Sequence, residues 1–419
     1  MQNVYIIQNS ELSFDMDVAQ LYFPEKNNLF LIINQFSLEK LKKRNQDILF
    51  EKIWLDDDFG FDHLKKIIQD NQKNASGSFH IVTNAEESIL VCGELRKYFN
   101  LDQSNYDRFI NKILMKQLIE KAGLLYPKYL RFDSKDYSDN SENYLKNIIQ
   151  TLQFPIIIKP IDSCNCMNVE KIYNANSLKT WCDKKYLTRT TFELDEFIEG
   201  KVYNCDSYIK NNKIIFTQVS ECSNSCFDFI CGLTKGTIAL PHHDPIYQFF
   251  CEYTLEVHHA IGMPRAGVTH LEVILTKDNK PYFLEIAHRS PGVLIPAMYK
   301  KFLNVATIEP HILLQIDDSY TLPLKKGPYC AWVAFPKIKG RLIKKYNPVI
   351  KSEYRLEWVF DIGDTMSVVS RGRDYAGRVL LWNDDYEQLR KDFYYLSSFQ
   401  FFDVEKNDHL IAENSTNQQ

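Results

Sequence analysis

The chain has 419 residues, of which 45% are hydrophobic and 25% charged, a composition typical of globular proteins. That length is enough for about three domains. The formal net charge of −4 provides no basic field for nucleic acid. No apolar stretch reaches the roughly 18 residues of a membrane-spanning helix, and the N-terminus is too short and uncharged for a signal peptide. We therefore expect a cytoplasmic protein with no nucleic-acid or membrane partner.

Short apolar strands alternate with amphipathic helical stretches over residues 1–102. The expected strands are Val4–Ile7, Leu29–Ile33, Ile48–Trp54 and Phe79–Val82. The expected helices are Leu38–Arg44 and Phe61–Gln69. This alternation is typical of a small α/β domain. A polar junction at residues 102–105 ends the domain, and a second unit is expected over residues 105–316.

A lysine near the end of a strand marks the first functional feature of the second unit. A polar loop is expected at Ser134–Asn143, and the apolar strand Phe154–Pro160 then carries Lys159. A loop of small residues at 161–168 and a new strand at Val169–Tyr173 follow at once. This order indicates a flap that folds over phosphates with the lysine beneath it, whereas a snorkelling surface lysine is the alternative. The acidic-apolar segment Phe192–Gly200 is extended, and its main chain could hydrogen-bond a flat base.

Two glutamates form the most informative pair in the sequence. Residues 269–276 and 281–286 predict a hairpin, because two strand-like runs flank a polar turn. If Thr276 pairs with Pro281, Glu272 and Glu285 are direct cross-strand partners. Opposed like charges about 5 Å apart destabilise a sheet unless a cation lies between them, and Mg²⁺ with phosphate oxygens meets that demand. Solvated carboxylates on an exposed sheet face are the alternative.

The segment after the second glutamate adds a guanidinium. Arg289 and the Pro291-Gly292 turn lie just past Glu285, which suits a clamp on an oxyanion or a phosphoryl group. Beyond a boundary near residues 317–320, strands are expected at 329–335, 358–360, 365–370 and 378–382, with a helix at 385–396. The tail from Glu413 is polar and expected to be disordered.

The cysteines and histidines allow competing interpretations. Ten scattered cysteines in so long a chain indicate reduced thiols. The spacing of Cys222, Cys226, Cys231 and Cys251 with nearby histidines matches no common zinc pattern. Cys164 and Cys166 would form a strained disulfide at best.

Taken in order, these features resemble the ATP-grasp enzymes, and specifically the carboxylate–amine ligases that make dipeptides and related amides. The lysine strand, the flap, the E-F-I-x-G segment, H-x-E and E-x-x-x-R carry the resemblance. Residues 111–123 are also similar to the D-K-x-x-M-R…L…A-G start of that module. The resemblance runs from about Phe79 to about Ile316 and rests on the ordered set of motifs.

The resemblance implies an α/β and α+β multidomain chain with an ATP-grasp fold. Its units would be an N-terminal α/β pre-ATP-grasp domain at 1–102, the ATP-grasp module at 105–316, a small, mainly β C-terminal cap domain at 320–412 that also carries a helix, and the tail at 413–419. The implied activity is ATP-dependent ligation of a small acid to an amine through an acyl phosphate, with release of ADP and phosphate. A homodimer is compatible with the resemblance.

The resemblance also implies roles for individual residues. The nucleotide-binding set is Lys112, Lys159, Cys164, Asn165, Cys166, Glu196, Phe197, Ile198 and Asp206. Glu272 and Glu285 would bind Mg²⁺, with Mn²⁺ as an alternative ion, and Arg289 and Glu285 would act in catalysis. The substrate-side candidates are His242, His243, His270, His288 and Gly292.

The sequence departs from the family pattern at three places. Ser163, Asn165 and Asn168 stand where the flap commonly has glycines, although asparagine tolerates a positive φ. Ala287 replaces the asparagine of the usual E-x-N metal motif, and Val202 stands at the position of a ribose-binding glutamate. These departures motivate an alternative, a catalytically impaired nucleotide-binding protein with a regulatory or scaffolding role. Other ATP-grasp chemistry, phosphorylation or carboxylation, is a third interpretation.

Overall fold

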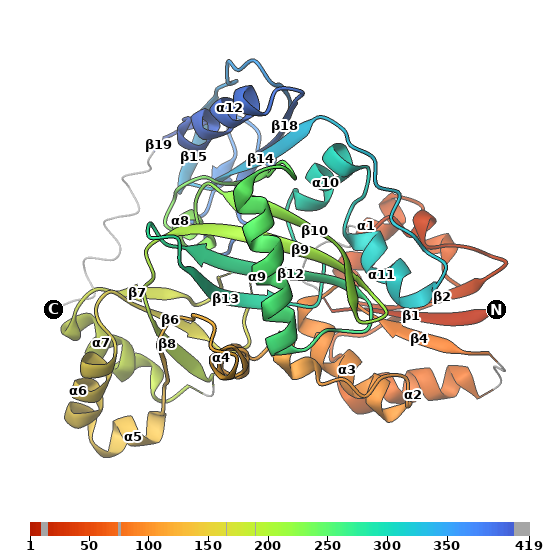
Figure 1. Ribbon diagram of the computed structural model, residues 1–419, viewed down its shortest axis with the longest axis horizontal. Helices are drawn as coiled ribbons and strands as arrows, with labels where there is room; N and C mark the ends of the chain where they lie inside the picture. Colours follow the sequence, from red (N-terminus) through yellow and green to blue (C-terminus); the bar gives the residue numbers. More distant parts are fainter. Residues whose placement is uncertain (10–15, 74–76, 165, 189, 406–419) are drawn as a thin grey trace.

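The computed structural model describes residues 1–9, 16–73, 77–164, 166–188 and 190–405. Its strands form four sheets, and Figure 1 shows a central sheet flanked by an N-terminal α/β unit and by a small α+β unit on the opposite side. This arrangement confirms the expected mixed α/β, multidomain fold class. Within the described residues, no helix has the length and apolar character needed to cross a bilayer.

The N-terminal unit is built on a parallel sheet with the strand order β3-β2-β1-β4. Its elements are β1 (Gln2–Gln8), η1 (Val18–Gln20), β2 (Asn27–Ile33), α1 (Gln35–Lys43), η2 (Asp47–Leu49), β3 (Lys52–Leu55), α2 (Phe61–Gln72), β4 (Phe79–Val82), η3 (Glu86–Ser88) and α3 (Ile89–Tyr98). β1 and β2 are continuously apolar because helices cover both faces of a parallel sheet. The expected strand at 48–54 is wrong at its start, where the chain first makes the 3-10 turn η2.

The small α+β unit is a four-stranded antiparallel sheet with the order β5-β8-β6-β7. Its elements are β5 (Tyr129–Arg131), α5 (Ser134–Asp139), α6 (Ser141–Thr151), β6 (Ile156–Pro160), β7 (Glu170–Ile172), α7 (Ala175–Lys185) and β8 (Phe192–Glu196). The expected polar loop at 134–143 is wrong, because α5 and the start of α6 occupy it. The side chain of Asp133 caps α5 and that of Asn140 caps α6, so polar residues here start helices.

The central sheet has eight strands in the order β13-β12-β9-β10-β11-β14-β18-β16. Its first half and the associated helices are η4 (Tyr106–Phe109), α4 (Lys112–Lys121), β9 (Lys201–Lys210), β10 (Lys213–Cys222), α8 (Cys226–Ile230), β11 (Lys235–Ala239), α9 (Pro245–Ile261), β12 (Gly267–Leu275) and β13 (Pro281–Ala287). α4 and α9 pack on one face, and α9 crosses that face in Figure 1. The sheet therefore presents the H-x-E and E-x-x-x-R strands at one edge.

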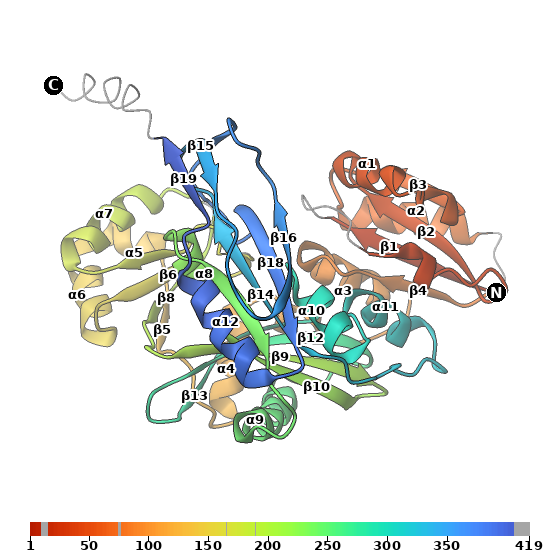
Figure 2. The same ribbon diagram turned by 90° about the horizontal axis from the view of Figure 1, so that it is seen from above.

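The C-terminal strands extend this same sheet past the expected boundary near residue 320. The remaining elements are α10 (Ile295–Leu303), α11 (Ile308–Ile316), β14 (Tyr329–Pro336), β15 (Gly340–Lys345), β16 (Glu353–Trp358), β17 (Thr365–Met366), β18 (Tyr375–Asn383), α12 (Tyr386–Ser398) and β19 (Phe402–Glu405). β14 pairs with β11, and β17, β15 and β19 form a separate small sheet. Figure 2 shows the N-terminal unit beside β16 and β18.

A buried histidine joins the N-terminal unit to the central sheet. His311 on α11 accepts a hydrogen bond from Val268 N at 2.8 Å, and its Nε2 donates to Thr83 O at 2.9 Å. Burial lowers the pKa of His311 to about 4, so the ring is neutral and can donate from one nitrogen while accepting at the other. This bridge holds the segment Asn84–Glu87 close to the end of β13.

Candidate active site

β12 and β13 place Glu272 and Glu285 directly opposite each other, which confirms the predicted pairing. Both side chains line a cavity of about 130 Å³. A protein cation accompanies each carboxylate, since His270 Nε2 lies 3.3 Å from Glu272 Oε1 and Lys112 Nζ lies 3.4 Å from Glu285 Oε2. Burial alone would raise the pKa of Glu285, but the charge of Lys112 and further cations outweigh burial and lower it. Glu285 is therefore an ionised carboxylate.

The hairpin reaches this register by a different route from the expected one. Pro281 pairs with Leu275 instead of Thr276. A regular ladder continued from that pair would place Glu272 opposite Leu284. An extra residue in β13, Leu284, then shifts the register and restores the opposition. β-bulges are frequent next to active sites, where they re-aim a side chain.

A buried cluster of two lysines and two carboxylates lies behind the flap. Lys116 Nζ is 2.5 Å from Asp195 Oδ1 and 3.2 Å from Glu193 Oε2. Lys159 Nζ is 3.1 Å from Asp195 Oδ2 and 3.3 Å from Glu193 Oε1. Burial opposes the charge on Lys159, but the two carboxylates outweigh it and raise its pKa. The predicted phosphate ligand Lys159 is thus already paired within the protein.

Lys112, the other predicted phosphate ligand, links the flap to the metal-site candidates. It begins α4, whose N-terminus is capped by the Asn111 side chain. Its Nζ donates a 2.7 Å hydrogen bond to Ser163 O in the flap while it faces Glu285. Lys112 therefore stands between the phosphate-flap backbone and one carboxylate of the hairpin.

The flap adopts left-handed backbone conformations without glycine. Cys166 has a φ of 55° and Asn168 a φ of 56°. The expectation that an asparagine here would accept a positive φ is confirmed at Asn168, whereas Asn165 lies outside the described residues. Cys166 lines the small cavity with Glu272, and Cys164 lines a larger one beside it.

Restoring glycine at Asn168 should change the apparent affinity for Mg-ATP by less than about tenfold, or roughly 1.4 kcal/mol. The left-handed backbone is already formed, so Asn168→Gly mainly relieves a cost on the order of 1 kcal/mol. Isothermal titration measures the change. Asn211→Gly is the matched control, because Asn211 has a φ of 51° in the distant β9–β10 turn. A larger loss confined to Asn168→Gly would mean that its side chain holds the nucleotide.

The predicted base-binding segment closes the other side of the flap. Glu196 ends β8, where its main-chain N–H donates to Lys128 O and its Oε1 accepts from Lys128 N, both at 2.9 Å. The side chain of Phe197 is exposed, and the Lys171 ammonium lies 3.4 Å from its ring centre. Ile198 is half-buried beyond it. The main-chain N–H and one carboxylate oxygen of Glu196 are therefore engaged with Lys128 in this structure.

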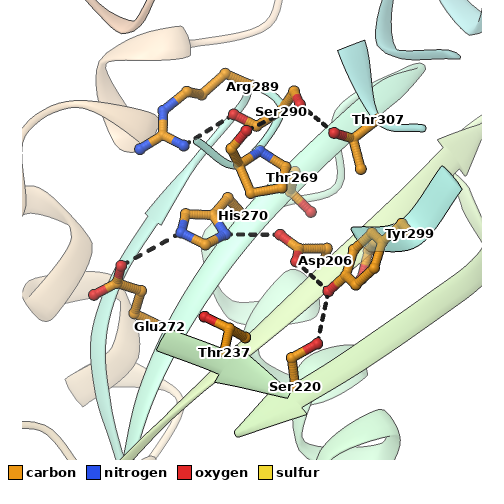
Figure 3. Close-up of polar contacts among 12 residues, drawn as sticks. Asp206, Ser220, Thr237, Thr269, His270, Glu272, Arg289, Ser290, Tyr299 and Thr307 are labelled. Atoms are coloured by element: carbon orange, nitrogen blue, oxygen red, sulfur yellow. Dashed lines mark hydrogen bonds and ion pairs between the residues drawn. The ribbon is translucent and has the colours of Figure 1, made fainter. Parts of the chain in front are cut away.

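Asp206 belongs to a buried polar chain that ends at Glu272 (Figure 3). Its Oδ1 lies 2.7 Å from His270 Nδ1, and its Oδ2 accepts a 2.6 Å hydrogen bond from Tyr299, which contacts Ser220 at 2.9 Å. Asp206 is fully buried and does not line the small cavity. It faces His270 and Tyr299 in place of the expected nucleotide. The chain fixes the orientation of the His270 ring toward Glu272.

The free energy of unfolding should fall at alkaline pH because His270 loses its proton. Burial favours neutral His270, but Asp206 and Glu272 outweigh burial and raise its pKa to about 9. Because the folded pKa exceeds the unfolded value of about 6.5, the stabilisation is complete below pH about 6.5 and is lost as pH rises through about 9. We expect a loss on the order of 2–3 kcal/mol between those values. Urea unfolding of the wild type and His270→Gln measures it, and parallel pH profiles would contradict the assignment.

Arg289 emerges from the end of β13 into the site. Its Nε lies 2.7 Å from Glu86 Oε2, and its Nη1 donates to Ser290 O at 3.0 Å. Burial would lower the pKa of Arg289, but Glu86 outweighs it and raises the pKa. The neighbouring Ser290 is held by a hydroxyl contact with Thr307 (Figure 3). The guanidinium is therefore fixed in position by the N-terminal unit.

A second cavity of about 400 Å³ lies next to the small one. Its wall is built by the N-terminal unit, the turn after β13, α10, α11 and the C-terminal strands. A cavity of this volume can enclose a small-molecule ligand. Both cavities share four lining residues, Arg289, Gly292, Val293 and Arg373. The site thus has a small cavity with the two glutamates and an adjoining larger cavity.

Of the substrate-side candidates, only His270 and Gly292 line either cavity. His242 Nε2 donates a 3.1 Å hydrogen bond to Gln218 Oε1 and its ring packs beside Tyr247, and both His242 and His243 are exposed. His288 faces Ala266 O at 2.9 Å behind the sheet. The expected substrate contacts of these three histidines therefore find no support in the described geometry.

The cysteines are reduced, as expected. The ten cysteines are all free thiols. Cys166 shares a side-chain hydrogen bond with Cys226, not with Cys164, and this contact lowers the pKa of Cys226. Among the described residues, no group of three His, Cys, Asp or Glu side chains is arranged to hold a metal ion by itself.

The donor set at the hairpin fits Mg²⁺ only with help from a ligand. Glu272 and Glu285 supply hard carboxylate oxygens into one cavity, and Ala287 has no side-chain donor there. Mg²⁺ prefers octahedral oxygen coordination and commonly takes one or two carboxylates together with phosphates and waters. Two glutamates facing a phosphate flap match that preference.

Comparisons with known proteins agree with this geometry. The family described as D-ala D-ala ligase C-terminus matches residues 118–316. The L-arginine-specific L-amino acid ligase of Bacillus subtilis is 24% identical over 306 residues, which cover 68% of this chain and 71% of the relative. The D-alanine–D-alanine ligase of Carboxydothermus hydrogenoformans is 24% identical over 196 residues, covering 45% and 62%.

A solved structure extends the similarity to the whole chain. The L-amino acid ligase from Bacillus licheniformis superposes with a TM-score of 0.71 at 15% sequence identity, covering 97% of this chain and 99% of that one. Its extent includes the N-terminal unit and the C-terminal strands that the matched family leaves out. Together with the ordered lysine, flap and glutamate elements, these findings show that the chain has the ATP-grasp fold and is similar to ligases of the carboxylate–amine type.

Proposed function

We propose that the chain joins a small carboxylic acid to an amine in a reaction coupled to cleavage of ATP. The acid would be an amino acid or a similar compound. The acid would be activated as an acyl phosphate, and ADP and phosphate would be released. The observation that carries this proposal is the direct junction of the two cavities at Arg289. A phosphoryl group bound beside Glu272 and Glu285 would there meet a carboxylate bound in the larger cavity. The Bacillus subtilis relative, an L-arginine-specific L-amino acid ligase, supports the same class of reaction.

Each part of the site has a role in this proposal. Glu272 and Glu285 would hold Mg²⁺, or Mn²⁺, on the ATP phosphates, and Lys112 would contact those phosphates from beneath the flap. Cys164 and Cys166 would cover them, with the segment Glu196–Ile198 beside the adenine. Arg289 would face the transferred phosphoryl group and the acid carboxylate. Lys159 would act on the nucleotide while Glu193 and Asp195 hold it in place.

The chemistry of acyl-phosphate ligation fits a site without a protein nucleophile. Phosphoryl transfer depends mainly on positioning and on neutralising charge that develops on the phosphoryl oxygens. The carboxylate oxygen of the acid would attack the γ-phosphorus, and the bond to the ADP oxygen would break. The amine nitrogen would then attack the acyl carbon and phosphate would leave. The lysines and Arg289 would neutralise charge on the phosphoryl oxygens, and the carboxylates would hold the metal ion.

The products of the reaction test this proposal. A screen of amino-acid and amine pairs should release phosphate only when ATP, an acid and an amine are all present. Nucleotide chromatography should show ADP in a one-to-one ratio with the amide product, because the γ-phosphoryl group is the one transferred. Stoichiometric AMP would indicate an acyl-adenylate and overturn the proposal. Tight Mg-ATP binding without turnover for any pair would support the regulatory alternative.

A further inference from the structure

We infer that Arg373, from the C-terminal extension of the central sheet, is a second arginine of the reaction centre and contacts the phosphoryl group during its transfer to the acid. The inference rests on the proposed function and adds a residue to the same site. No pattern in the sequence connects Arg373 with the ATP-grasp motifs, because it follows a separate small sheet and lies outside the 118–316 match.

The two cavities locate Arg373 at the point of transfer. It lines the small cavity that holds Glu272 and Glu285, and it also lines the 400 Å³ cavity. Only one other charged side chain, Arg289, lines both among the described residues. In the proposed reaction, the phosphoryl group must leave the first cavity and arrive in the second. A charged group common to both walls can contact it throughout.

The backbone after Arg289 is shaped for close approach by Arg373. A Cβ atom added to Gly292 would lie 3.1 Å from Arg373 Nη2, so the glycine leaves room for the guanidinium at the turn. The next residue, Val293, has a φ of 56°, a conformation that a β-branched side chain rarely adopts. Such local strain is concentrated at functional sites. The turn therefore leaves room for the Arg373 guanidinium close to the segment that follows Arg289.

The loop that carries Arg373 is anchored on both sides of it. Asp374 Oδ2 accepts hydrogen bonds from Ser370 N at 2.9 Å and from Arg371 N at 3.2 Å. Lys235 on β11 donates to Gly372 O at 2.5 Å. These contacts fix the loop against the central sheet before any ligand binds. A pre-organised donor needs little reorganisation during the reaction, which makes it effective at stabilising developing charge.

The charge balance at the junction gives a reason for a second arginine. Arg289 is already 2.7 Å from Glu86, so part of its charge is compensated by the protein. During its transfer, the phosphoryl group spreads its negative charge over three oxygens. Guanidinium contacts to it can raise the rate by several orders of magnitude. Arg373 supplies a further cation at the Gly292 turn. Two fixed guanidiniums and Mg²⁺ would then surround the transferred group.

The test compares Arg373→Gln and Arg373→Lys with the wild type, and Arg371→Gln is the matched control from the same loop, since Arg371 lines neither cavity. With a productive acid and amine pair, Arg373→Gln should lower kcat by at least about 100-fold. Its KM for ATP should change by less than about threefold, because the ground-state nucleotide keeps its other contacts. Arg373→Lys should recover part of the loss. Arg371→Gln should retain wild-type kcat.

A second measurement does not depend on knowing the substrates. Calorimetry with Mg²⁺, ADP and aluminium fluoride, a mimic of the phosphoryl group in transfer, should show binding at least about tenfold weaker in Arg373→Gln. Mg-ADP alone should bind both proteins equally. The inference is overturned if kcat stays within threefold of the wild type, or if the mimic binds both proteins alike. If no acid and amine pair is ever turned over, the proposed function fails, but the binding comparison still decides the role of Arg373.

Discussion

Replacing Glu285 by glutamine should lower ligation by at least about 100-fold and remove most of the Mg²⁺ dependence of nucleotide binding. Glu285 is ionised, faces Glu272 across the hairpin and lies 3.4 Å from Lys112. Glutamine keeps the shape but removes the negative charge that would bind the cation. In the wild type, Mg-ATP at 100 times its dissociation constant should stabilise the fold by about 2.7 kcal/mol. ATP with a chelator should do so much less, because the opposed carboxylates then lack their cation.

Thermal unfolding with and without Mg²⁺ measures the binding effect, and coupled ADP release measures turnover. Glu199→Gln is the matched control, since Glu199 is an exposed carboxylate paired with Lys277 near the same hairpin. Equal thermal shifts with Mg-ATP and with ATP plus chelator would remove the paired-carboxylate metal site. A Glu285→Gln variant that unfolds without ligand at the wild-type temperature excludes general destabilisation as the cause of lost turnover.

Local patterns predict the hairpin, since two strand-like runs flank a polar turn. The expected Thr276–Pro281 register is wrong, so the predicted opposition of Glu272 and Glu285 depends on a second feature. The extra residue Leu284 restores the opposition, and a bulge has no local sequence pattern that distinguishes it from regular strand. The flap was predictable for a similar reason. Asn168 accepts the left-handed backbone that a glycine would otherwise provide.

Roles that depend on tertiary packing were not predictable from local patterns. The resemblance implies a nucleotide contact for Asp206, but the side chain it faces, His270, lies on a neighbouring strand, so only strand pairing reveals the contact. His242 and His288 are equally plausible ligands in a linear sequence, but the His242 ring is hydrogen-bonded to Gln218 beside Tyr247, and His288 is buried beside Phe109. Arg373 reaches the junction because the C-terminal strands join the central sheet. That joining requires the pairing of β11 with β14, which connects segments about 100 residues apart.

The spacing of charged residues in the sequence indicates part of the buried cluster of lysines and carboxylates. Lys112 and Lys116 are spaced i, i+4, which places them on one face of a helix, and Glu193 and Asp195 are spaced i, i+2 on one face of a strand. These two periodicities predict two charged faces. They do not predict that α4 and β8 pack together. The interpretation of Lys159 as a phosphate ligand alone therefore missed the pair of carboxylates that holds it.

Replacing Lys116 by methionine should destabilise the fold by about 3–5 kcal/mol, the usual cost of removing one partner from a buried ion pair. Lys116 is fully buried, and its ammonium lies within 3.2 Å of both Glu193 and Asp195. Methionine preserves the length of the side chain but leaves two buried carboxylates with Lys159 as their single ammonium partner in the cluster. Excess buried negative charge is costly because the interior solvates it poorly. The same change should shift Lys159 toward the carboxylates and weaken its contact with ATP.

Urea unfolding of Lys116→Met measures the loss, with Lys121→Met as the control, because Lys121 is exposed in the last turn of the same helix and should change stability by no more than about 0.5 kcal/mol. Adding Asp195→Asn to Lys116→Met removes one unpaired charge, so the double variant should be more stable than the single one. That recovery distinguishes a charge imbalance from a packing defect, since Asp195→Asn restores no volume lost at Lys116. A double variant less stable than Lys116→Met would show that the lysine stabilises the fold through packing and hydrogen bonding instead of charge.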